Sequence, residues 1–302
     1  MAADADHDRI LSELDIHADP FAICALEGAC SLGLGRNPGS TLHYVLGGRG
    51  RITFQTLAPL PLLPGRLVLV PASLGHSLMN DGGGQVGLPA CEPAGLDLER
   101  HIAMGKGDGN MLVLCSHVTL GMRDTHGLVD LLRTPLWMDV AQSGTAAGAM
   151  RALMAEMTCP RAGRGAMIRV LLLQCMIELL RDRLEAGDPA VLWLRALADP
   201  GLWQALRTML DDPGAPHSLE RLSEVAGMSR TRFAARFQAA YGHAPMAFLR
   251  RLRLARAARL LAETRQPVKR IAEKVGFRSR SAFTRAFAGE WGQSPRTFRK
   301  DV

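Results

Sequence analysis

Several residue patterns are missing from this 302-residue chain, and each absence excludes a class of protein. The six cysteines all lie at or before Cys175 and none forms a CxxC pair, which excludes a zinc finger and a thioredoxin-like site. No apolar run approaches the roughly 18 residues that a membrane span needs. The acidic start, MAADADHDRI, lacks the features of a signal peptide. We therefore expect a cytoplasmic protein with no membrane partner and mostly free thiols.

Acidic residues are scarce in the last third of the chain. From Arg195 to Val302 there are 21 Lys and Arg against 9 Asp and Glu, a net charge of +12. The remainder carries 15 against 20, a net charge of −5. A basic segment on a mildly acidic body indicates a polyanionic partner for that segment alone. An ordinary solvated surface is the alternative that charge alone leaves open.

The basic segment contains an internal duplication. At an offset of 50 residues, Phe233 aligns with Phe283, Phe237 with Phe287, Tyr241 with Trp291, Gly242 with Gly292, Pro245 with Pro295 and Phe248 with Phe298. Upstream the offset is 49, which pairs Leu222 with Ile271 and Gly227 with Gly276. Two copies constitute a duplication and are too few for a solenoid.

Each copy has the pattern of two short helices joined by a glycine turn. In the first copy Ser218 and Ser229 are candidate N-caps, and Gly227 ends the first helix. The second copy predicts helices over 267–275 and 279–290, on either side of Gly276. This is the helix-turn-helix pattern, whose second helix enters the DNA major groove.

Between the copies, nothing interrupts a helix that begins at Pro245 and continues to Glu263. Its length of about 30 Å would hold two recognition helices about one DNA turn apart. Its arginines are candidate phosphate contacts, although some of them would only solubilise the outer face: Arg250, Arg251, Arg253, Arg256 and Arg259.

Helical periodicity predicts which side chains face DNA. If Phe283 and Phe287 face the core, the opposite side carries arginines and hydroxyls, which bond to base edges and phosphates. The candidate DNA-binding residues are Arg280, Ser281, Thr284 and Arg285 in the second copy, and Arg230, Thr231, Arg232 and Ala235 in the first, where Ala234 also faces outward. The second copy is predicted to carry more base discrimination. The alternative is a pair of solvated helix faces.

These residues resemble the AraC/XylS family of bacterial transcription regulators over about residues 197–302. The second copy, IAEKVGFRSRSAFTRAFAGEWGQSPRTFR, carries the more specific motif, with S-P and an aromatic at Phe298 after Gly292. The resemblance implies an all-helical DNA-binding domain that usually activates transcription. It also implies that Arg280, Ser281, Thr284 and Arg285 contact bases and phosphates. In the first copy, Ala234 and Ala235 stand where larger polar side chains are common, which puts its readout in doubt.

Residues 20–120 contain short apolar segments between turns, such as LHYVL, GRITFQ and RLVLVP, which predict strands of a β-sandwich or barrel. The spacing of Gly65, Pro71, His76 and Asn80 resembles the second cupin motif. Of the first cupin motif only His43 remains, so a cupin enzyme with three histidines and a carboxylate is disfavoured. The Gly-rich stretch 80–110 is interpreted as an insertion.

His43 and His76 could meet inside the barrel, and Cys24 could complete a site for zinc or another divalent metal. The choice of Cys24 rests on a resemblance to the cupin-type sensor domain of some AraC-type regulators, which include reactive-chlorine sensors. Two hydrogen-bonded histidines without metal are the alternative. The candidate redox residues are Cys24, Cys30, Cys91 and Cys115, and Cys115 also has the simpler interpretation of a small core side chain.

From about residue 145 to 187 the pattern is helical, with Met167, Ile168, Leu171, Leu172, Cys175, Met176, Leu179 and Leu180 on one apolar face. In the resembling family such helices often form a homodimer interface; packing on the barrel is the alternative. The predicted fold is α+β with two domains: a cupin-like β-barrel sensor (1–140), a helical dimerisation and linker segment (141–194), and an all-α domain with two helix-turn-helix motifs (195–302).

We therefore predict a sequence-specific transcriptional regulator, interpreted as an activator and not an enzyme. Its expected partners are double-stranded promoter DNA, RNA polymerase, a second copy of the chain, and a small-molecule, metal or oxidant effector. Two alternatives are a cupin-type metalloprotein or enzyme with an appended DNA-binding domain, and a non-specific architectural protein. The outward arginines at 280 and 285 argue against the architectural protein, because dedicated base-reading groups would have no role in it.

Overall fold

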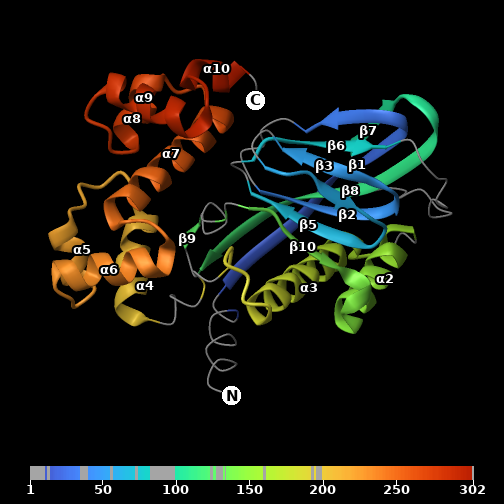
Figure 1. Cartoon of the computed structure of the whole chain (residues 1–302), viewed down its shortest axis with the longest axis horizontal. Helices are drawn as coiled ribbons and strands as arrows, with labels where there is room; N and C mark the ends of the chain where they lie inside the picture. The colour runs from blue at the N-terminus through green and yellow to red at the C-terminus, as the bar shows by residue number, and fades with distance from the viewer. Residues whose placement is uncertain are drawn as a thin grey trace. The chain divides into compact units, whose positions relative to one another are not determined.

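The computed structural model describes residues 11, 14–34, 40–54, 57–71, 74–81, 99–122, 125–126, 132, 134–158, 161–191, 194 and 199–300. The chain divides into two compact units (Figure 1). The β unit comprises Ile16–Leu120 and Leu132–Ala186, and the helical unit comprises Met1–Asp15, Gly121–Leu131 and Gly187–Val302. Among the described helices, none is both long and apolar enough to cross a membrane.

A sheet of ten strands among the described residues dominates the β unit. The strands are β1 (Leu14–Gly33), β2 (Ser40–Gly48), β3 (Gly50–Phe54), β4 (Leu60–Leu62), β5 (Arg66–Val70), β6 (His76–Asn80), β7 (Glu99–Met104), β8 (Lys106–Met122), β9 (Thr125–His126) and β10 (Leu136–Asp139). Their order is β10-β5-β2-β8-β1-β6-β3-β4, with β7 paired to β1 and β9 to β8. The apolar segments predicted to be strands lie in β2, β3 and β5, so those predictions are confirmed.

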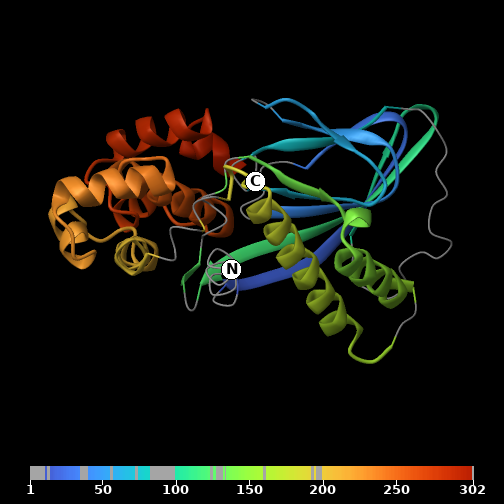
Figure 2. The same cartoon turned by 60° about the horizontal axis from the view of Figure 1, so that its bottom comes forward.

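The sheet curls into an open barrel (Figure 2). One apolar cluster shows why: Leu62 of β4, at one end of the sheet order, packs with Val68 of β5, which lies near the other end. Only a sheet that folds over on itself brings these side chains into one core. The stretch 80–110, interpreted from its sequence as an insertion, contributes β7 and the first residues of β8 to this sheet.

The 3-10 helix η2 (Val140–Gln142) and the helices α2 (Gly144–Thr158) and α3 (Arg164–Glu185) follow the sheet. In α3 the side chains of Ile168, Leu172 and Leu179 are buried, as the apolar periodicity predicts. Met167, on the same apolar stripe, is 46% exposed, because it lies one position away from the face that packs on α2 and β10.

The helical unit contains α4 (Pro200–Asp211), α5 (Leu219–Val225), α6 (Arg230–Tyr241), α7 (Pro245–Glu263), α8 (Val268–Lys274), α9 (Arg280–Trp291) and α10 (Pro295–Lys300). Helices α5 and α6 form the first helix-turn-helix pair, and α8 and α9 form the second (Figure 1). The 19-residue helix α7 connects them with the bounds that the sequence predicts.

Local chemistry sets the ends of these short helices. The hydroxyls of Ser218, Ser229 and Ser279 accept hydrogen bonds from the backbone amides of the following turn, at 3.2, 3.4 and 3.3 Å. Such caps satisfy amides that the helix leaves without partners. Gly227 and Gly276, at φ +63° and +83°, occupy the left-handed region that the turns require. The duplicated pattern therefore encodes the same supersecondary unit twice.

Candidate functional site

The two recognition helices, α6 and α9, bury their aromatic faces. Phe233 and Phe237 in α6 are fully buried, as are Phe283 and Phe287 in α9, which confirms the predicted orientation. The second set packs in a core that also contains Ile271, Trp291 and Phe298. A rotation of either helix about its axis would expose these rings, so the core fixes which residues face outward.

The predicted DNA-binding residues lie on the opposite faces. In α9, Arg280, Ser281 and Arg285 are exposed and Thr284 is half-buried. Within the described part of the chain, no hydrogen bond or ion pair engages the guanidinium of Arg280 or Arg285. In α6 the exposed residues are Arg230, Thr231, Arg232 and Ala235, and Ala234 is half-buried.

The first motif holds its leading arginine differently from the second. Arg230 donates to the carboxylate of Glu220 on α5 at 2.8 Å, and both side chains are exposed. This contact with Arg230 lowers the pKa of Glu220. At the offset of 49 residues, the position of Glu220 corresponds to Lys269 in the second motif. The first motif therefore pairs its leading arginine with a carboxylate, whereas the second motif has a lysine at the corresponding position.

Sequence reasoning missed several cations of the second motif. Lys269, Arg270 and Lys274 are exposed on α8, and Arg278 is exposed in the turn before α9. Arg278 is also the residue that shifts the repeat offset from 49 to 50, a signal that could have identified it. The result is a concentration of positive charge on the second motif, and electrostatic contact with phosphates supplies much of DNA affinity.

The arginines of α7 do not all remain available for phosphate. Arg253 donates to the carbonyls of Pro213 at 2.6 Å, Ala215 at 2.8 Å and Gly276 at 3.3 Å. Its prediction as a candidate phosphate contact is therefore wrong, since its donors are used inside the domain. Arg251 pairs with Glu290 at 3.1 Å. Arg250 is exposed on the same helix.

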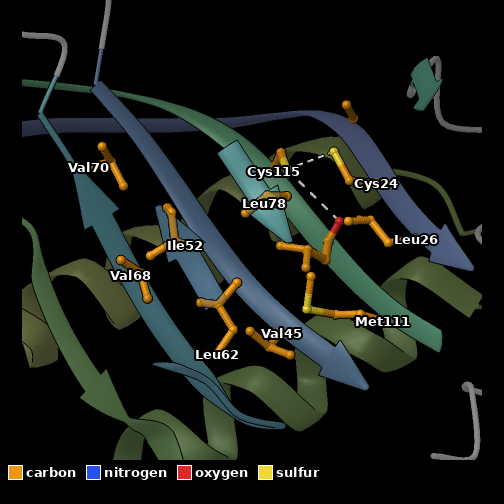
Figure 3. Close-up of a cluster of buried hydrophobic side chains, with 12 residues drawn as sticks. Cys24, Leu26, Val45, Ile52, Leu62, Val68, Val70, Leu78, Met111 and Cys115 are labelled. Atoms are coloured by element: carbon orange, nitrogen blue, oxygen red, sulfur yellow. Dashed lines mark hydrogen bonds between the residues drawn. The ribbon is translucent and has the colours of Figure 1, made fainter. Parts of the chain in front are cut away.

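In the β unit, four predicted or candidate residues form a buried chain of contacts. The Sγ atoms of Cys24 and Cys115 are 3.2 Å apart, and Figure 3 shows the two thiols turned toward each other. Nδ1 of His43 lies 3.3 Å from Sγ of Cys115, and Nε2 of His43 lies 2.9 Å from Nε2 of His76. Cys24, Cys115 and His43 are fully buried, and His76 is 7% exposed.

The hydrogen-bond partners fix the tautomers along this chain. Nδ1 of His76 lies 3.1 Å from the carbonyl oxygen of Leu74, which can only accept, so this nitrogen carries a proton. In a neutral ring Nε2 of His76 then accepts from Nε2 of His43. The hydroxyl oxygen of Thr41, 3.0 Å from Nε2 of His43, is a second acceptor for that proton. The assignment leaves Nδ1 of His43 as the acceptor for the thiol of Cys115. Each group thus donates to the next, from the thiol of Cys115 through His43 and His76 to the carbonyl oxygen of Leu74.

Burial controls the protonation of these groups. Desolvation lowers the pKa of His43 well below its usual value and lowers that of His76. The hydrogen bond that Cys115 shares with Cys24, followed by burial, raises the pKa of Cys115 well above its usual value. At neutral pH both imidazoles are therefore neutral, and Cys115 is a thiol and not a thiolate.

The predicted metal site of His43, His76 and Cys24 is not assembled in this arrangement. His43 uses opposite ring nitrogens for Cys115 and His76, so the sulfurs and the second imidazole lie on opposite sides of its ring. Among the described residues, no group of three or more His, Cys, Asp and Glu side chains is arranged to hold a metal ion. A structural zinc site needs four ligands around one point, and these residues do not fit it.

The other cysteines have separate environments. Cys30 is half-buried, donates to the carbonyl of Ala103 at 3.3 Å, and has its pKa raised mainly by burial. Cys175 lies in the buried face of α3, where burial raises its pKa to about 12. Cys91, also a predicted redox residue, lies outside the described residues. Among the redox candidates that the structure describes, only Cys24 and Cys115 are therefore brought together.

The paired helix-turn-helix motifs and the curled sheet define a class: a two-domain helix-turn-helix protein with a cupin domain. Comparisons with known proteins agree, since the cupin family matches residues 8–185 and the helix-turn-helix domain family matches residues 222–301. The chain belongs to the AraC family of DNA-binding transcriptional regulators and carries an N-terminal cupin domain.

Two curated relatives illustrate the family. The HTH-type transcriptional regulator AlkR of Acinetobacter baylyi is 27% identical over 97% of this chain and 98% of its own length. The RCS-specific HTH-type transcriptional activator RclR of Escherichia coli is 39% identical over 36% of this chain and 38% of its own length. The DNA-binding domain of AdpA, solved in complex with a target DNA, is 33% identical and covers 34% of this chain and 91% of its own, with a TM-score of 0.33.

Proposed function

We propose that this regulator activates transcription in response to an oxidant, which its cupin domain senses through Cys24 and Cys115. The observation that carries the proposal is the 3.2 Å approach of two thiols inside the apolar core of the β unit. The named relatives are transcriptional regulators, which supports a regulatory and not an enzymatic role. The protein would act in the cytoplasm as a homodimer and recruit RNA polymerase to its promoter.

DNA recognition in this proposal uses the exposed faces of α6 and α9. Arg280 and Arg285 have the chemistry to read guanine edges, and Ser281 and Thr284 to bond to base edges or phosphates. In α6, Arg230, Thr231 and Arg232 contribute polar contacts, and Ala235 offers a methyl group to thymine. The second motif supplies most base discrimination because no carboxylate of the described chain engages Arg280 or Arg285.

The sensing step is the oxidation of the two thiols to a disulfide. Cys24 lies on β1 and Cys115 on β8, and these strands are neighbours in the sheet. With hypochlorous acid, one thiol becomes a sulfenyl chloride and releases water; the other sulfur displaces chloride and releases a proton. Two thiols and one hypochlorous acid thus give a disulfide, water, chloride and a proton. The nitrogen Nδ1 of His43, 3.3 Å from Cys115, is placed to accept that proton.

The environment favours strong oxidants over weak ones. Peroxides react with thiolates, and a protonated, buried thiol reacts slowly with them. The raised pKa of Cys115 therefore protects the pair from peroxide, whereas hypochlorous acid is small, neutral at about neutral pH and far more reactive. This selectivity accords with the name of the E. coli relative, which describes an RCS-specific activator.

Transcription from the regulator's own promoter in vitro, before and after hypochlorous acid, tests the proposal. The wild type should respond, and Cys24→Ser and Cys115→Ser should not. Cys175→Ser is the matched control, because Cys175 is also buried in the β unit but lies in α3. Mass spectrometry of the treated wild type should find the Cys24–Cys115 disulfide. A wild-type response in Cys24→Ser would remove this pair as the sensor.

A further inference from the structure

The side chain of Arg253 connects the two helix-turn-helix motifs. Arg253 lies near the middle of α7, between the motifs in sequence. Its guanidinium bonds to the carbonyls of Pro213 and Ala215, in the segment that leads into α5 of the first motif. The same group bonds to the carbonyl of Gly276, in the turn of the second motif. One side chain thus joins the linking helix to both DNA-binding pairs.

The surrounding backbone is packed too closely for this contact to be incidental. A Cβ atom at Gly276 would lie 2.7 Å from the carbonyl oxygen of Gly214 and 2.9 Å from Cζ of Arg253. A Cβ atom at Gly214 would lie 2.3 Å from the carbonyl oxygen of Lys274. The segment before α5 therefore lies directly against the turn of the second motif, with the guanidinium between them. Gly227, which corresponds to Gly276 in the first motif, has open space where a Cβ atom would lie.

We propose that Arg253 is a positioning residue that fixes the spacing between the two recognition helices, so that the domain measures the distance between two DNA half-sites. Two rigidly joined binding modules gain affinity because the second binding event is intramolecular, and this gain is lost where geometry forbids both from engaging. The long helix α7 holds the motifs apart, and the Arg253 contacts stop each motif from pivoting about an end of that helix. The inference rests on the proposed binding of both motifs to one duplex.

The test compares the native promoter fragment with a fragment that has about half a DNA turn inserted between the half-sites found by footprinting. The wild type should bind the inserted fragment at least about tenfold more weakly, since only one motif can engage. Arg253→Gln removes the fork of donors and should bind the native fragment about tenfold more weakly than the wild type, yet bind the two fragments with similar affinity. Arg250→Gln, on the exposed face of the same helix, is the matched control and should keep the wild-type ratio.

The ratio of the two affinities distinguishes positioning from a merely structural contribution. If Arg253→Gln is less stable but retains the wild-type ratio, the proposal is overturned. If circular dichroism shows that Arg253→Gln is unfolded, Arg253→Lys serves in its place, because an ammonium cannot bridge three carbonyls in a fork, and the same ratio decides. Equal binding of both fragments by the wild type would instead overturn the binding of both motifs to one duplex.

Discussion

The carboxylate of Glu220 is predicted to weaken the electrostatic contribution of the first motif to DNA affinity. Glu220 forms an ion pair with the guanidinium of Arg230 at 2.8 Å, whereas Lys269 stands at the corresponding position in the second motif. The change Glu220→Lys therefore makes the first motif resemble the second. It frees Arg230 and adds a cation on the same face, which allows up to two new phosphate contacts.

The expected magnitude follows from counterion release. Each new phosphate contact steepens the dependence of log K on log salt by about 0.9, which corresponds to an affinity change of about three- to fourfold between 50 and 200 mM salt. Glu220→Lys should therefore steepen the slope by about 0.9 to 1.8. Fluorescence anisotropy titrations of labelled random-sequence DNA over that salt range measure it. The gain should be largest at low salt.

The control is Glu224→Lys, which makes the same charge change on the same helix, at an exposed residue that corresponds to Glu273 in the second motif. A smaller change in slope is expected for Glu224→Lys, because it leaves the Glu220–Arg230 pair intact. If both variants steepen the slope equally, net charge alone explains the effect. The reasoning about Arg230 would then be refuted.

Two further predictions concern stability. Because burial lowers the pKa of His43 and His76, the unfolded chain binds more protons below their usual value of 6.5, so stability falls as pH drops below it. Thermal melts should show a loss of up to about 1.4 kcal/mol per histidine per pH unit, and His76→Gln should flatten this dependence; an unchanged dependence would contradict the neutral pair. Separately, Gly227→Ala should cost about 1–2 kcal/mol through left-handed strain alone, and Gly276→Ala clearly more, since its Cβ also meets backbone. Urea unfolding midpoints compare them, and equal costs would contradict the close packing at Gly276.

The duplicated motif could be predicted from sequence because its signals are local. Capping serines, turn glycines and aromatics one helical turn apart lie within a few residues of one another and fix each helix and its buried face. The exposure of Arg280 and Arg285 follows from that periodicity. Met167 shows what periodicity leaves open: it lies on the apolar stripe of α3, but the pattern does not reveal that this edge of the stripe is exposed.

The long-range contacts could not be predicted in the same way. In the sequence, Arg253 is one more cation on a basic helix. Its carbonyl partners at Pro213 and Ala215 are about 40 residues away along the chain. The approach of Cys24 to Cys115 depends on which strands are neighbours in the sheet, and a chain that keeps only His43 of the first cupin motif does not reveal that order. The metal prediction was wrong in arrangement for the same reason. Two histidines at suitable spacing do meet, but they contact each other through Nε2 atoms while the thiols lie beyond the other ring nitrogen.

The most direct test of the account is the affinity of the Arg280→Ala variant for two DNA fragments at physiological salt: the promoter that the protein regulates and a scrambled fragment of equal composition. If α9 reads bases through its exposed arginines, the substitution should weaken promoter binding by about 1–3 kcal/mol and leave scrambled DNA nearly unaffected. An equal loss on both fragments would make Arg280 a phosphate contact. No loss on either would contradict the assignment of α9 as the recognition helix.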